Sequence, residues 1–364
     1  MAINKQPSIM LAAGGTGGHL FPAIAVADEF RIRNYASIHL VTDYRCKKYL
    51  PEDLDAKIHI INLHFKSGFT NKIRSLFQLG IGCVKALFLV KKIKPDVVIG
   101  FGGYPSFPTM LAAKILRIPI VIYEPNSLLG RVNHFFAKST RVIALSYAKT
   151  IKTEMYDSSK ILVIGSIVRS SIGDLSNKYN ANANPFNIFI FGGSQGAKIF
   201  DTLIPNIIEE LLKLNSTVKI KITQQVAKAQ EAKLRDRYKA LDVECELFDF
   251  CHNMAEIYKN TQIVITRSGA GAVAELTNSA IPAIFIPFPF AKDDHQFFNA
   301  KAIEEINASW CYKQEEIRPQ VVAKKLNTLI KNRDLLITAS QNLAKHQSKN
   351  AAMYLVDTVM KIIS

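Results

Sequence analysis

A short apolar run followed by a Gly-Gly-[Ser/Thr]-x-Gly loop occurs twice in this chain, once in each half. Residues 8–13 precede Gly14 to Gly18, and residues 187–191 precede Gly192 to Gly196. A buried parallel strand reads as a continuous apolar run, and glycines let the chain turn tightly from a strand into a helix. The same unit repeated 178 positions apart in 364 residues therefore predicts two tandem α/β domains, each built on a doubly wound parallel sheet.

Two more strand-like runs end in small or polar residues. Residues 97–99 lead into Gly100 to Tyr104, and residues 263–266 lead into Ser268 to Gly271. Ligands of open parallel sheets bind beyond the carboxyl ends of the strands. We therefore expect the functional site at these loops, in a cleft between the two domains, with the domain boundary near or just before the polar segment 173–185.

The charge of the chain is concentrated in its first half. The formal net charge is +16, of which residues 1–170 carry +13 and residues 171–364 carry +3. Between Asp55 and Asp96 there is no acidic residue, but there are eight basic ones: Lys57, Lys66, Lys72, Arg74, Lys85, Lys91, Lys92 and Lys94. Apolar residues at helical spacing alternate with them, which is typical of a helix lying on an anionic membrane. A core-packed helix with a solvated basic face is the alternative.

Several classes of protein are disfavoured. No apolar run approaches the ~18 to 20 residues of a membrane-spanning helix. The five cysteines are scattered and form no C-x-x-C pair, so we expect reduced thiols in a cytosolic protein and no metal site. Gly192 to Gly196 lacks the Gly-Lys-[Ser/Thr] ending of a Walker loop. The net charge would suit a nucleic-acid-binding protein, but the chain has no recognisable RNA or DNA module.

His19 directly follows the first glycine-rich loop, where we expect a strand to end and a helix to begin. The free N–H groups of a helix start attract anions, and an imidazole at that place suits a general base. As a dinucleotide fingerprint the loop is imperfect, because Leu20 stands where the last glycine would be. A capping or packing histidine is the alternative interpretation.

In the second half, small side chains from Ser268 to Ala272 leave the N–H groups of a predicted helix start accessible to a diphosphate. Glu275 follows about one turn later, where its carboxylate would accept hydrogen bonds from sugar hydroxyls or simply favour the helix start. Asp294, Gln296 and Asn299 follow another predicted strand and suit either sugar binding or helix capping.

Taken together, these segments resemble the MurG family of bacterial N-acetylglucosaminyltransferases. The family's motifs occur in its order at residues 14–19, 102–106, 124–126, 192–197, 267–275 and 294–300. The resemblance implies the GT-B fold, with an acceptor-binding and membrane-facing domain of residues 1–168 plus 345–364. A second domain, residues 169–344, would bind UDP-N-acetylglucosamine.

The resemblance also implies the reaction. N-acetylglucosamine would pass from UDP-N-acetylglucosamine to the 4-hydroxyl of the muramyl sugar of undecaprenyl-diphosphate-linked lipid I, with inversion and with no metal or other cofactor. The product would be lipid II, for peptidoglycan synthesis and hence cell wall growth, cell shape and division. We expect the enzyme to be peripheral, on the anionic cytoplasmic face of the inner membrane, with no nucleic-acid partner.

The family's site residues map onto this sequence. His19 and Glu275 are the expected catalytic-site residues, and His19 and Tyr104 would face the acceptor. Within the donor site, Ser194 and residues 270–274 would meet the phosphates, Arg169 and Cys251 the uracil side, Glu275 the ribose, and Asn126 and Gln296 the N-acetylglucosamine. The full set of expected donor contacts is Thr16, Gly17, Gly18, Asn126, Arg169, Ser194, Cys251, Ala270, Gly271, Ala272, Val273, Ala274, Glu275 and Gln296.

The chain departs from the family's pattern at four positions. Ser166 and Ile167 stand where Asn-Pro is common, Phe107 replaces a frequent glycine, and Pro125 a frequent glutamine. Two related activities remain open alternatives: a UDP-N-acetylglucosamine 2-epimerase, which needs no lipid acceptor, and a diacylglycerol glycosyltransferase, which uses another one.

Overall fold

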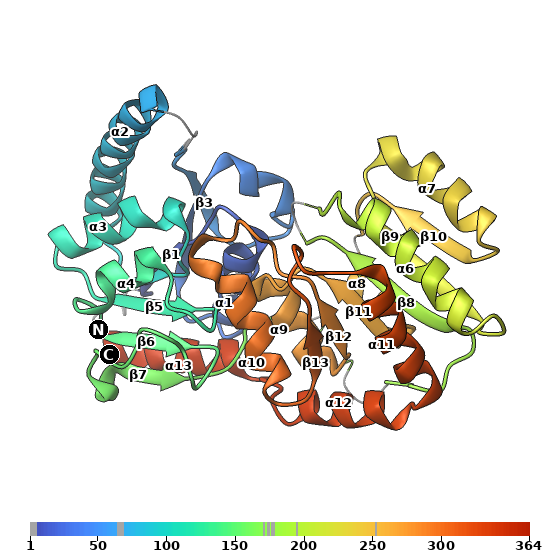
Figure 1. The fold of residues 1–364 in the computed structure, drawn as a ribbon. Helices are drawn as coiled ribbons and strands as arrows, with labels where there is room; N and C mark the ends of the chain where they lie inside the picture. Colours follow the sequence, from blue (N-terminus) through green and yellow to red (C-terminus); the bar gives the residue numbers. More distant parts are fainter. Residues whose placement is uncertain are drawn as a thin grey trace. The chain divides into compact units, whose positions relative to one another are not determined.

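Two compact units make up the chain in the computed structural model (Figure 1). The first unit comprises Met1–Arg169 and Asn350–Ser364, and the second comprises Ser170–Lys349. Each is built on one parallel sheet covered by helices, which confirms the predicted class of two doubly wound α/β domains. The structure describes residues 6–63, 69–169, 172, 175, 179–193, 196–251 and 253–364.

The sheet of the first unit has the strand order β3-β2-β1-β4-β5-β6-β7, with all strands parallel. Its strands are β1 (Ser8–Ala12), β2 (Ser37–Thr42), β3 (Lys57–Ile60), β4 (Val97–Gly100), β5 (Ile120–Glu124), β6 (Val142–Leu145) and β7 (Ile161–Val163). The order of strands reverses between β1 and β4, so this pair forms the topological switch point, where ligands of such sheets bind.

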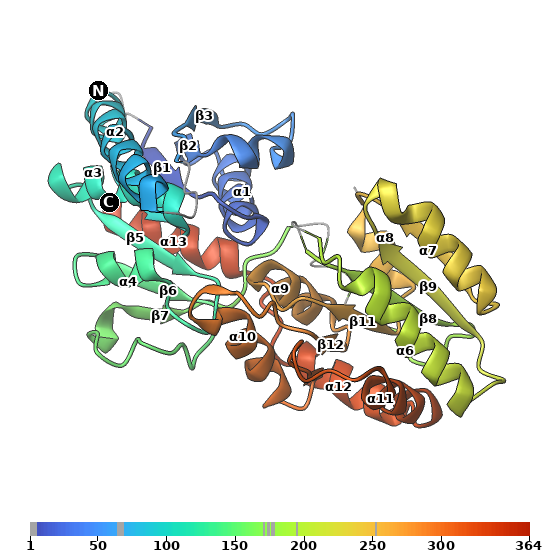
Figure 2. The same cartoon turned by 45° about the horizontal axis from the view of Figure 1, so that its top comes forward.

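Helices cover both faces of this sheet because side chains along each strand alternate between them. Ile9 and Leu11 point toward α1 (Gly17–Ile32) and α13 (Ala351–Ile363), and Met10 and Ala12 point toward the other side. On that side lie α2 (Phe69–Ile93), α3 (Phe107–Ile115) and α4 (Arg131–Ala137). Figure 2 shows α13, in red, alongside the first unit, although it is the last helix of the chain.

The chain crosses between the units twice, and the second crossing lies later than expected. Arg169 belongs to the first unit, and the chain returns to that unit at Asn350 rather than at Lys345. The physical reason is hydrogen bonding to a residue of the second unit that is distant in the sequence. Gln347 Nε2 donates to the carbonyl oxygen of Asn278 over 2.9 Å, and the N–H of Ser348 donates to Asn278 Oδ1 over 3.0 Å. These bonds hold the residues just before Asn350 to the second unit.

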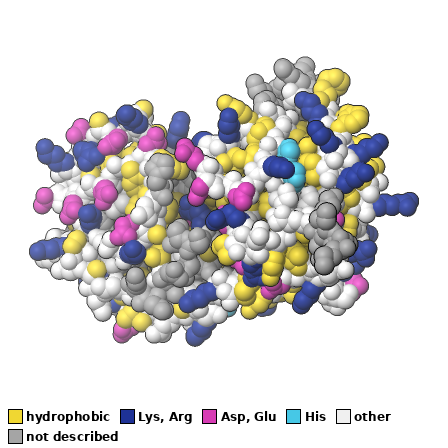
Figure 3. All heavy atoms as spheres, turned by 180° about the vertical axis from the view of Figure 1, so that it is seen from behind, with side chains coloured by type: hydrophobic (Ala, Val, Ile, Leu, Met, Phe, Trp, Pro, Cys, Tyr) yellow, Lys and Arg dark blue, Asp and Glu magenta, His cyan; other side chains and the backbone are white. Residues whose placement is uncertain are grey.

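A stripe of exposed apolar side chains runs along α2. Phe77, Ile81, Val84 and Phe88 are 69%, 41%, 54% and 69% exposed. Their spacing of four, three and four residues places them on one side of the helix, while Ala86 and Val90 pack into the sheet. Figure 3 shows yellow apolar and dark blue basic side chains together at the upper right, where α2 lies.

The sheet of the second unit repeats the topology, with the parallel order β10-β9-β8-β11-β12-β13. Its strands are β8 (Phe186–Phe191), β9 (Ile220–Gln225), β10 (Glu244–Phe248), β11 (Ile263–Thr266), β12 (Ala283–Phe285) and β13 (Ser309–Cys311). The helices are α6 (Phe200–Leu214), α7 (Lys228–Ala240), α8 (Met254–Lys259), α9 (Ala270–Ser279), α10 (His295–Glu304), α11 (Pro319–Lys331) and α12 (Asp334–Ala344). Here the order reverses between β8 and β11.

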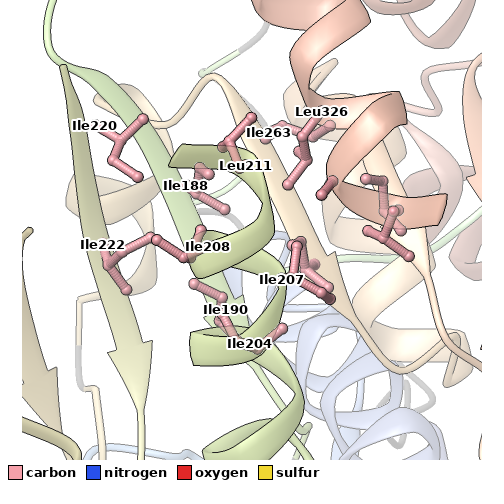
Figure 4. Packing of buried hydrophobic residues seen from close by; sticks show 14 of the residues in the cluster. Ile188, Ile190, Ile204, Ile207, Ile208, Leu211, Ile220, Ile222, Ile263 and Leu326 are labelled. Carbon is pink, nitrogen blue, oxygen red and sulfur yellow. The ribbon is translucent and has the colours of Figure 1, made fainter. Parts of the chain in front are cut away.

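The core of the second unit is rich in isoleucine and leucine (Figure 4). On α6 the buried residues Ile204, Ile207, Ile208 and Leu211 recur at helical spacing and pack on Ile188 of β8. Full burial of each such side chain stabilises the fold by about 1.5–3 kcal/mol. The packing holds β8 rigidly, and with it the start of the second glycine-rich loop.

Candidate active site

At the switch point of the first unit, two glycine-containing loops pack closely against each other. A Cβ atom added at Gly103, whose φ is +76°, would lie 2.5 Å from the carbonyl oxygen of Gly14. A Cβ atom at Gly14 would lie 2.8 Å from the Cβ atom of Pro105. Neither position accepts a side chain without displacing the neighbouring loop, so the glycines here serve close approach as well as turning.

His19 lies in the first turn of α1, half-buried between these loops, and its Nδ1 atom is 2.8 Å from the carbonyl oxygen of Phe101. A carbonyl oxygen only accepts hydrogen bonds, so Nδ1 carries the proton in the neutral ring and Nε2 carries the lone pair. Gly102 allows the approach, because a Cβ atom there would lie 3.2 Å from Nδ1. The structure thus gives His19 the tautomer in which Nε2 can accept a proton.

The other expected residues of this loop lie beside His19. Thr16 is the N-terminal cap of α1 in an extended conformation, and its carbonyl oxygen accepts from the N–H of His19 over 3.2 Å. Gly17 and Gly18 form the first turn, where helical N–H groups have no partner within the helix. Tyr104 follows Gly103 and begins a short 3-10 turn, Tyr104–Ser106. The structure therefore brings His19, Tyr104 and the glycine-rich loop to one edge of the sheet.

Glu124 ends β5 and is fully buried, and its carboxylate accepts four hydrogen bonds. Oε1 accepts from the backbone N–H and from Nδ2 of Asn126, over 3.0 and 2.8 Å. Oε2 accepts from the N–H of Gly130 and from Nδ2 of Asn133, both over 2.8 Å. Burial raises the pKa of this carboxyl group, and the four donors oppose that shift. Glu124 thereby fixes the position of Asn126, the expected sugar contact, and the sequence analysis assigned a role to neither Glu124 nor Asn133.

At the switch point of the second unit, α9 begins without any side-chain cap and with no acidic residue in its first turn. A Cβ atom at the capping residue Gly269 would meet no atom of the described residues within 4 Å. Next to it, the hydroxyl of Ser268 is buried and has no hydrogen-bond partner among the described residues. An uncapped helix start beside an unsatisfied hydroxyl is suited to an anionic group.

Residues 270–274 are the expected diphosphate contacts, but not all five have a backbone N–H group without a partner inside the helix. The N–H of Val273 already donates to the carbonyl oxygen of Gly269 over 3.1 Å, and the side chains of Val273 and Ala274 are buried. Ala270, Gly271 and Ala272 therefore hold the N–H groups that lack a partner within the helix. The second glycine-rich loop, which follows β8, contains two glycines in the left-handed region, with φ values of +76° at Gly193 and +70° at Gly196. Ser194, the expected phosphate contact in that loop, lies outside the described residues.

Glu275 lies in the second turn of α9 and is 8% exposed. Its Oε2 atom accepts a hydrogen bond from the hydroxyl of Tyr258 on α8 over 3.1 Å. Tyr258 is 2% exposed, and its role is not predicted from the sequence. No sequence motif marks it, because the contact joins residues 17 positions apart on two different helices.

Gln296 and Arg267 hold the loops around the ends of β11 and β12. Gln296 Oε1 accepts from the N–H of Phe288 over 3.0 Å. The Arg267 guanidinium donates through Nη1 to the carbonyl oxygens of Ile286 and Pro287, both over 3.0 Å, and through Nη2 to Gln314. Burial lowers the pKa of Arg267 to about 10. Arg267 is thus a buried anchor between strand ends.

The two residues expected at the uracil side belong to different units. The Arg169 guanidinium stacks on the ring of Phe21 in the first unit, with 4.6 Å between its carbon and the ring centroid. Cys251 is half-buried in the second unit, between β10 and α8. Their shared role stays a prediction.

The described part of the chain contains neither a metal-binding cluster nor a membrane-spanning helix. Among those residues, no three His, Cys, Asp or Glu side chains are grouped so that they would hold a metal ion. Over the same residues, no helix combines the length and apolar character needed to cross a membrane.

Comparisons with known proteins define the class. The family model described as glycosyltransferase family 28 N-terminal domain matches residues 9–145, and that of the family's C-terminal domain matches residues 187–355. Both matches contain the switch-point loops of their unit. The chain is therefore a glycosyltransferase of family 28.

Relatives narrow the family. The UDP-N-acetylglucosamine–N-acetylmuramyl-(pentapeptide) pyrophosphoryl-undecaprenol N-acetylglucosamine transferase of Rickettsia bellii is 43% identical over 344 residues, which are 94% of this chain and 96% of that one. The enzyme of the same name from Rickettsia canadensis is 44% identical over 342 residues, with the same shares. The chain belongs to this family of N-acetylglucosamine transferases, the MurG family, as the resemblance indicated.

Solved structures agree on the fold. The crystal structure of Acinetobacter baumannii MurG is 28% identical, with a TM-score of 0.79, and the match covers 98% of this chain and 99% of that one. A UDP-N-acetylglucosamine 2-epimerase from Neisseria meningitidis, bound to UDP-N-acetylglucosamine, matches with a TM-score of 0.69 over 97% of this chain and 100% of its own. At 14% identity the epimerase shares the fold alone.

Proposed function

We propose that this enzyme transfers N-acetylglucosamine from UDP-N-acetylglucosamine to the 4-hydroxyl of the muramyl sugar of undecaprenyl-diphosphate-linked lipid I, giving lipid II for peptidoglycan synthesis. The observation that carries the proposal is the identity of 43% with a transferase of that name over 94% of the chain. The two switch points support it, because the first carries His19, which suits a general base, and the second carries the start of α9, which suits an anion.

The second unit binds the donor in this proposal. The diphosphate lies at the start of α9, where the N–H groups of Ala270, Gly271 and Ala272 and the hydroxyl of Ser268 are its hydrogen-bond donors. Glu275 accepts hydrogen bonds from the ribose hydroxyls. As the bond to UDP breaks, negative charge grows on the diphosphate, and these fixed donors stabilise it without requiring a divalent ion.

The first unit binds the acceptor and supplies the base. His19 Nε2 takes the proton of the muramyl 4-hydroxyl, and that oxygen attacks the anomeric carbon from the face opposite UDP. A new bond forms between that oxygen and the anomeric carbon as the bond from the anomeric carbon to UDP breaks. The electron pair of the breaking bond leaves with UDP. Attack from the opposite face inverts the anomeric centre.

We further propose that the first unit rests on the anionic cytoplasmic face of the inner membrane through α2. The exposed apolar stripe Phe77, Ile81, Val84 and Phe88 would enter the interface, and Lys85, Lys91, Lys92 and Lys94 would meet anionic headgroups. A lipid-linked acceptor is held at such a surface, so this placement brings the acceptor to the unit that carries His19. Lys66 lies outside the described residues.

The test is transfer of labelled N-acetylglucosamine from UDP-N-acetylglucosamine to a lipid I analogue, in the presence of EDTA. We expect a labelled disaccharide lipid and no transfer to diacylglycerol. Transfer to diacylglycerol alone would replace the proposed acceptor. Appearance of the manno epimer from UDP-N-acetylglucosamine without any acceptor would replace the proposed reaction. Loss of activity in EDTA that Mg²⁺ restores would overturn the metal-independent mechanism.

A further inference from the structure

Next to Glu275 lies an aromatic cluster formed by residues of β8, β10 and α8, in which Phe189, Phe191 and Tyr258 are buried and Phe248 is half-buried. The ring of Tyr258 lies 5.9 Å from that of Phe189 and 6.5 Å from that of Phe191, between ring centroids. Phe189 also stacks on Phe191 at 4.9 Å and packs against Phe248 at 6.2 Å. Ring packing of this kind leaves the phenol little freedom to turn.

The Tyr258 hydroxyl therefore reaches Glu275 from a fixed direction. Its hydrogen bond to Oε2 is 3.1 Å long, and both side chains are more than nine-tenths buried. A hydrogen bond to a carboxylate is stronger than one between neutral groups, and a buried one restricts the rotamers of the acceptor. The orientation of the Glu275 carboxylate is thus set before any ligand binds.

Tyr258 also connects two parts of the second unit. It lies on α8, which begins at Met254, three positions after Cys251. Asn253 caps the start of α8, because its Oδ1 atom accepts from the N–H of Glu256 over 3.3 Å. Phe191, against which Tyr258 packs, is the last residue before the loop that begins at Gly192. The side chain of Tyr258 on α8 therefore contacts both the carboxylate on α9 and the end of β8.

We propose that Tyr258 is a positioning residue that orients Glu275 for the ribose hydroxyls of the donor nucleotide. The proposal rests on the proposed function, in which Glu275 binds the ribose. Tyr258 itself touches no substrate. It acts by holding the carboxylate in the rotamer that accepts from the sugar, so the protein does not have to order this side chain when the nucleotide binds.

The test compares the affinity for UDP with that for 2′,3′-dideoxy-UDP, which lacks the ribose hydroxyls. Tyr258→Phe keeps the ring and removes only the hydroxyl. We expect it to weaken UDP binding about three- to tenfold and to leave 2′,3′-dideoxy-UDP binding unchanged. The KM for UDP-N-acetylglucosamine should rise by a similar factor, with kcat within about twofold.

A matched control is Tyr238→Phe. Tyr238 is another buried phenol of the same unit, on α7, and its hydroxyl donates to Gln224 Oε1 over 2.5 Å. Its loss removes a buried hydrogen bond from a phenol to a neutral amide, without touching Glu275. We expect the ratio of the two affinities to equal that of the unaltered enzyme.

Three results separate failure of this inference from failure of the proposed function. If Tyr258→Phe weakens the binding of UDP and of 2′,3′-dideoxy-UDP equally, the phenol only supports packing, and the inference is overturned. An unchanged ratio in Tyr258→Phe, together with a reduced ratio in Glu275→Ala, overturns it too but keeps the ribose contact. If Glu275→Ala leaves the ratio of the affinities for UDP and 2′,3′-dideoxy-UDP unchanged, Glu275 does not bind the ribose, and that part of the proposed function is wrong.

Discussion

The two units share one topology but carry different chemistry at the same place. In both sheets the strand order reverses beside the first strand, and a glycine-rich loop follows that strand. In the first unit this edge holds the ionisable side chains His19 and Glu124. In the second unit it holds the start of α9, whose first turn, Ala270 to Val273, carries small or apolar side chains and no ionisable one. The fold thus supplies the same position twice, and the residues that follow the strands differ in the way that suits the two roles we propose, proton transfer in the first unit and anion binding in the second.

The largest expected effect tests the proton-transfer half of this comparison. His19→Ala should lower kcat by about 10²- to 10⁴-fold, because a positioned base contributes that much. UDP affinity should stay within about twofold of the original, since the diphosphate donors lie in the other unit. Single-turnover transfer to a lipid I analogue measures the first quantity, and calorimetry with UDP the second. The exposed His346 of the second unit provides the control, His346→Ala.

If His19→Ala lowered kcat only a few-fold, His19 would not be the general base. The contrast between the units would then reduce to two binding surfaces without proton transfer.

The next effect concerns the stability of the first unit. Glu124→Gln replaces a buried carboxylate that accepts four hydrogen bonds with an amide that presents two N–H groups to the same donors. We expect the free energy of unfolding to fall by about 2–4 kcal/mol. Denaturant unfolding of this variant and of Glu154→Gln, an exposed glutamate of the same unit, measures the difference. If the two variants had the same free energy of unfolding, the hydrogen bonds to the Glu124 carboxylate would not stabilise the fold.

The third effect tests the membrane contact, which we assign to the first unit alone. Phe88→Ser should weaken binding to vesicles containing anionic lipid about tenfold, because it removes an exposed apolar side chain from the proposed interface. Co-sedimentation measures this, and UDP affinity should not change. Ile32→Ser alters an equally exposed residue on α1 and should leave vesicle binding intact. If the two variants bind vesicles alike, α2 is not the contact.

The smallest effect tests the anion site of the second unit. Ser268→Ala removes a buried hydroxyl that has no hydrogen-bond partner among the described residues, so the free enzyme should be as stable as before or slightly more stable. UDP affinity should nevertheless fall about threefold, because the hydroxyl is a proposed phosphate donor. Calorimetry with UDP and a thermal melt measure both quantities. Unchanged UDP affinity would confine the anion site to the backbone of α9.

Local patterns were enough to predict the strand ends and the residues that follow them. His19, Glu275 and the glycine-rich loops were found because each lies a few residues after an apolar run, and a parallel sheet gathers such loops at one edge. The contact of Tyr258 with Glu275 and the link from Phe101 to His19 were not predicted, because packing between separate elements creates them. The boundary at Asn350 was missed for the same reason, since bonds to a residue some 70 positions earlier hold Gln347 and Ser348.

The position of α13 has a consequence for how the chain folds. Ala351, Leu355, Val356 and Val359 complete the core of the first unit against α1, and Asp357 pairs with Arg33 over 2.5 Å. A ribosome makes these residues only after the whole second unit has been made. The apolar face of the first unit that α13 covers therefore stays exposed until this last helix has been synthesised. Completing the core then depends on contacts between residues far apart in the sequence, which form slowly.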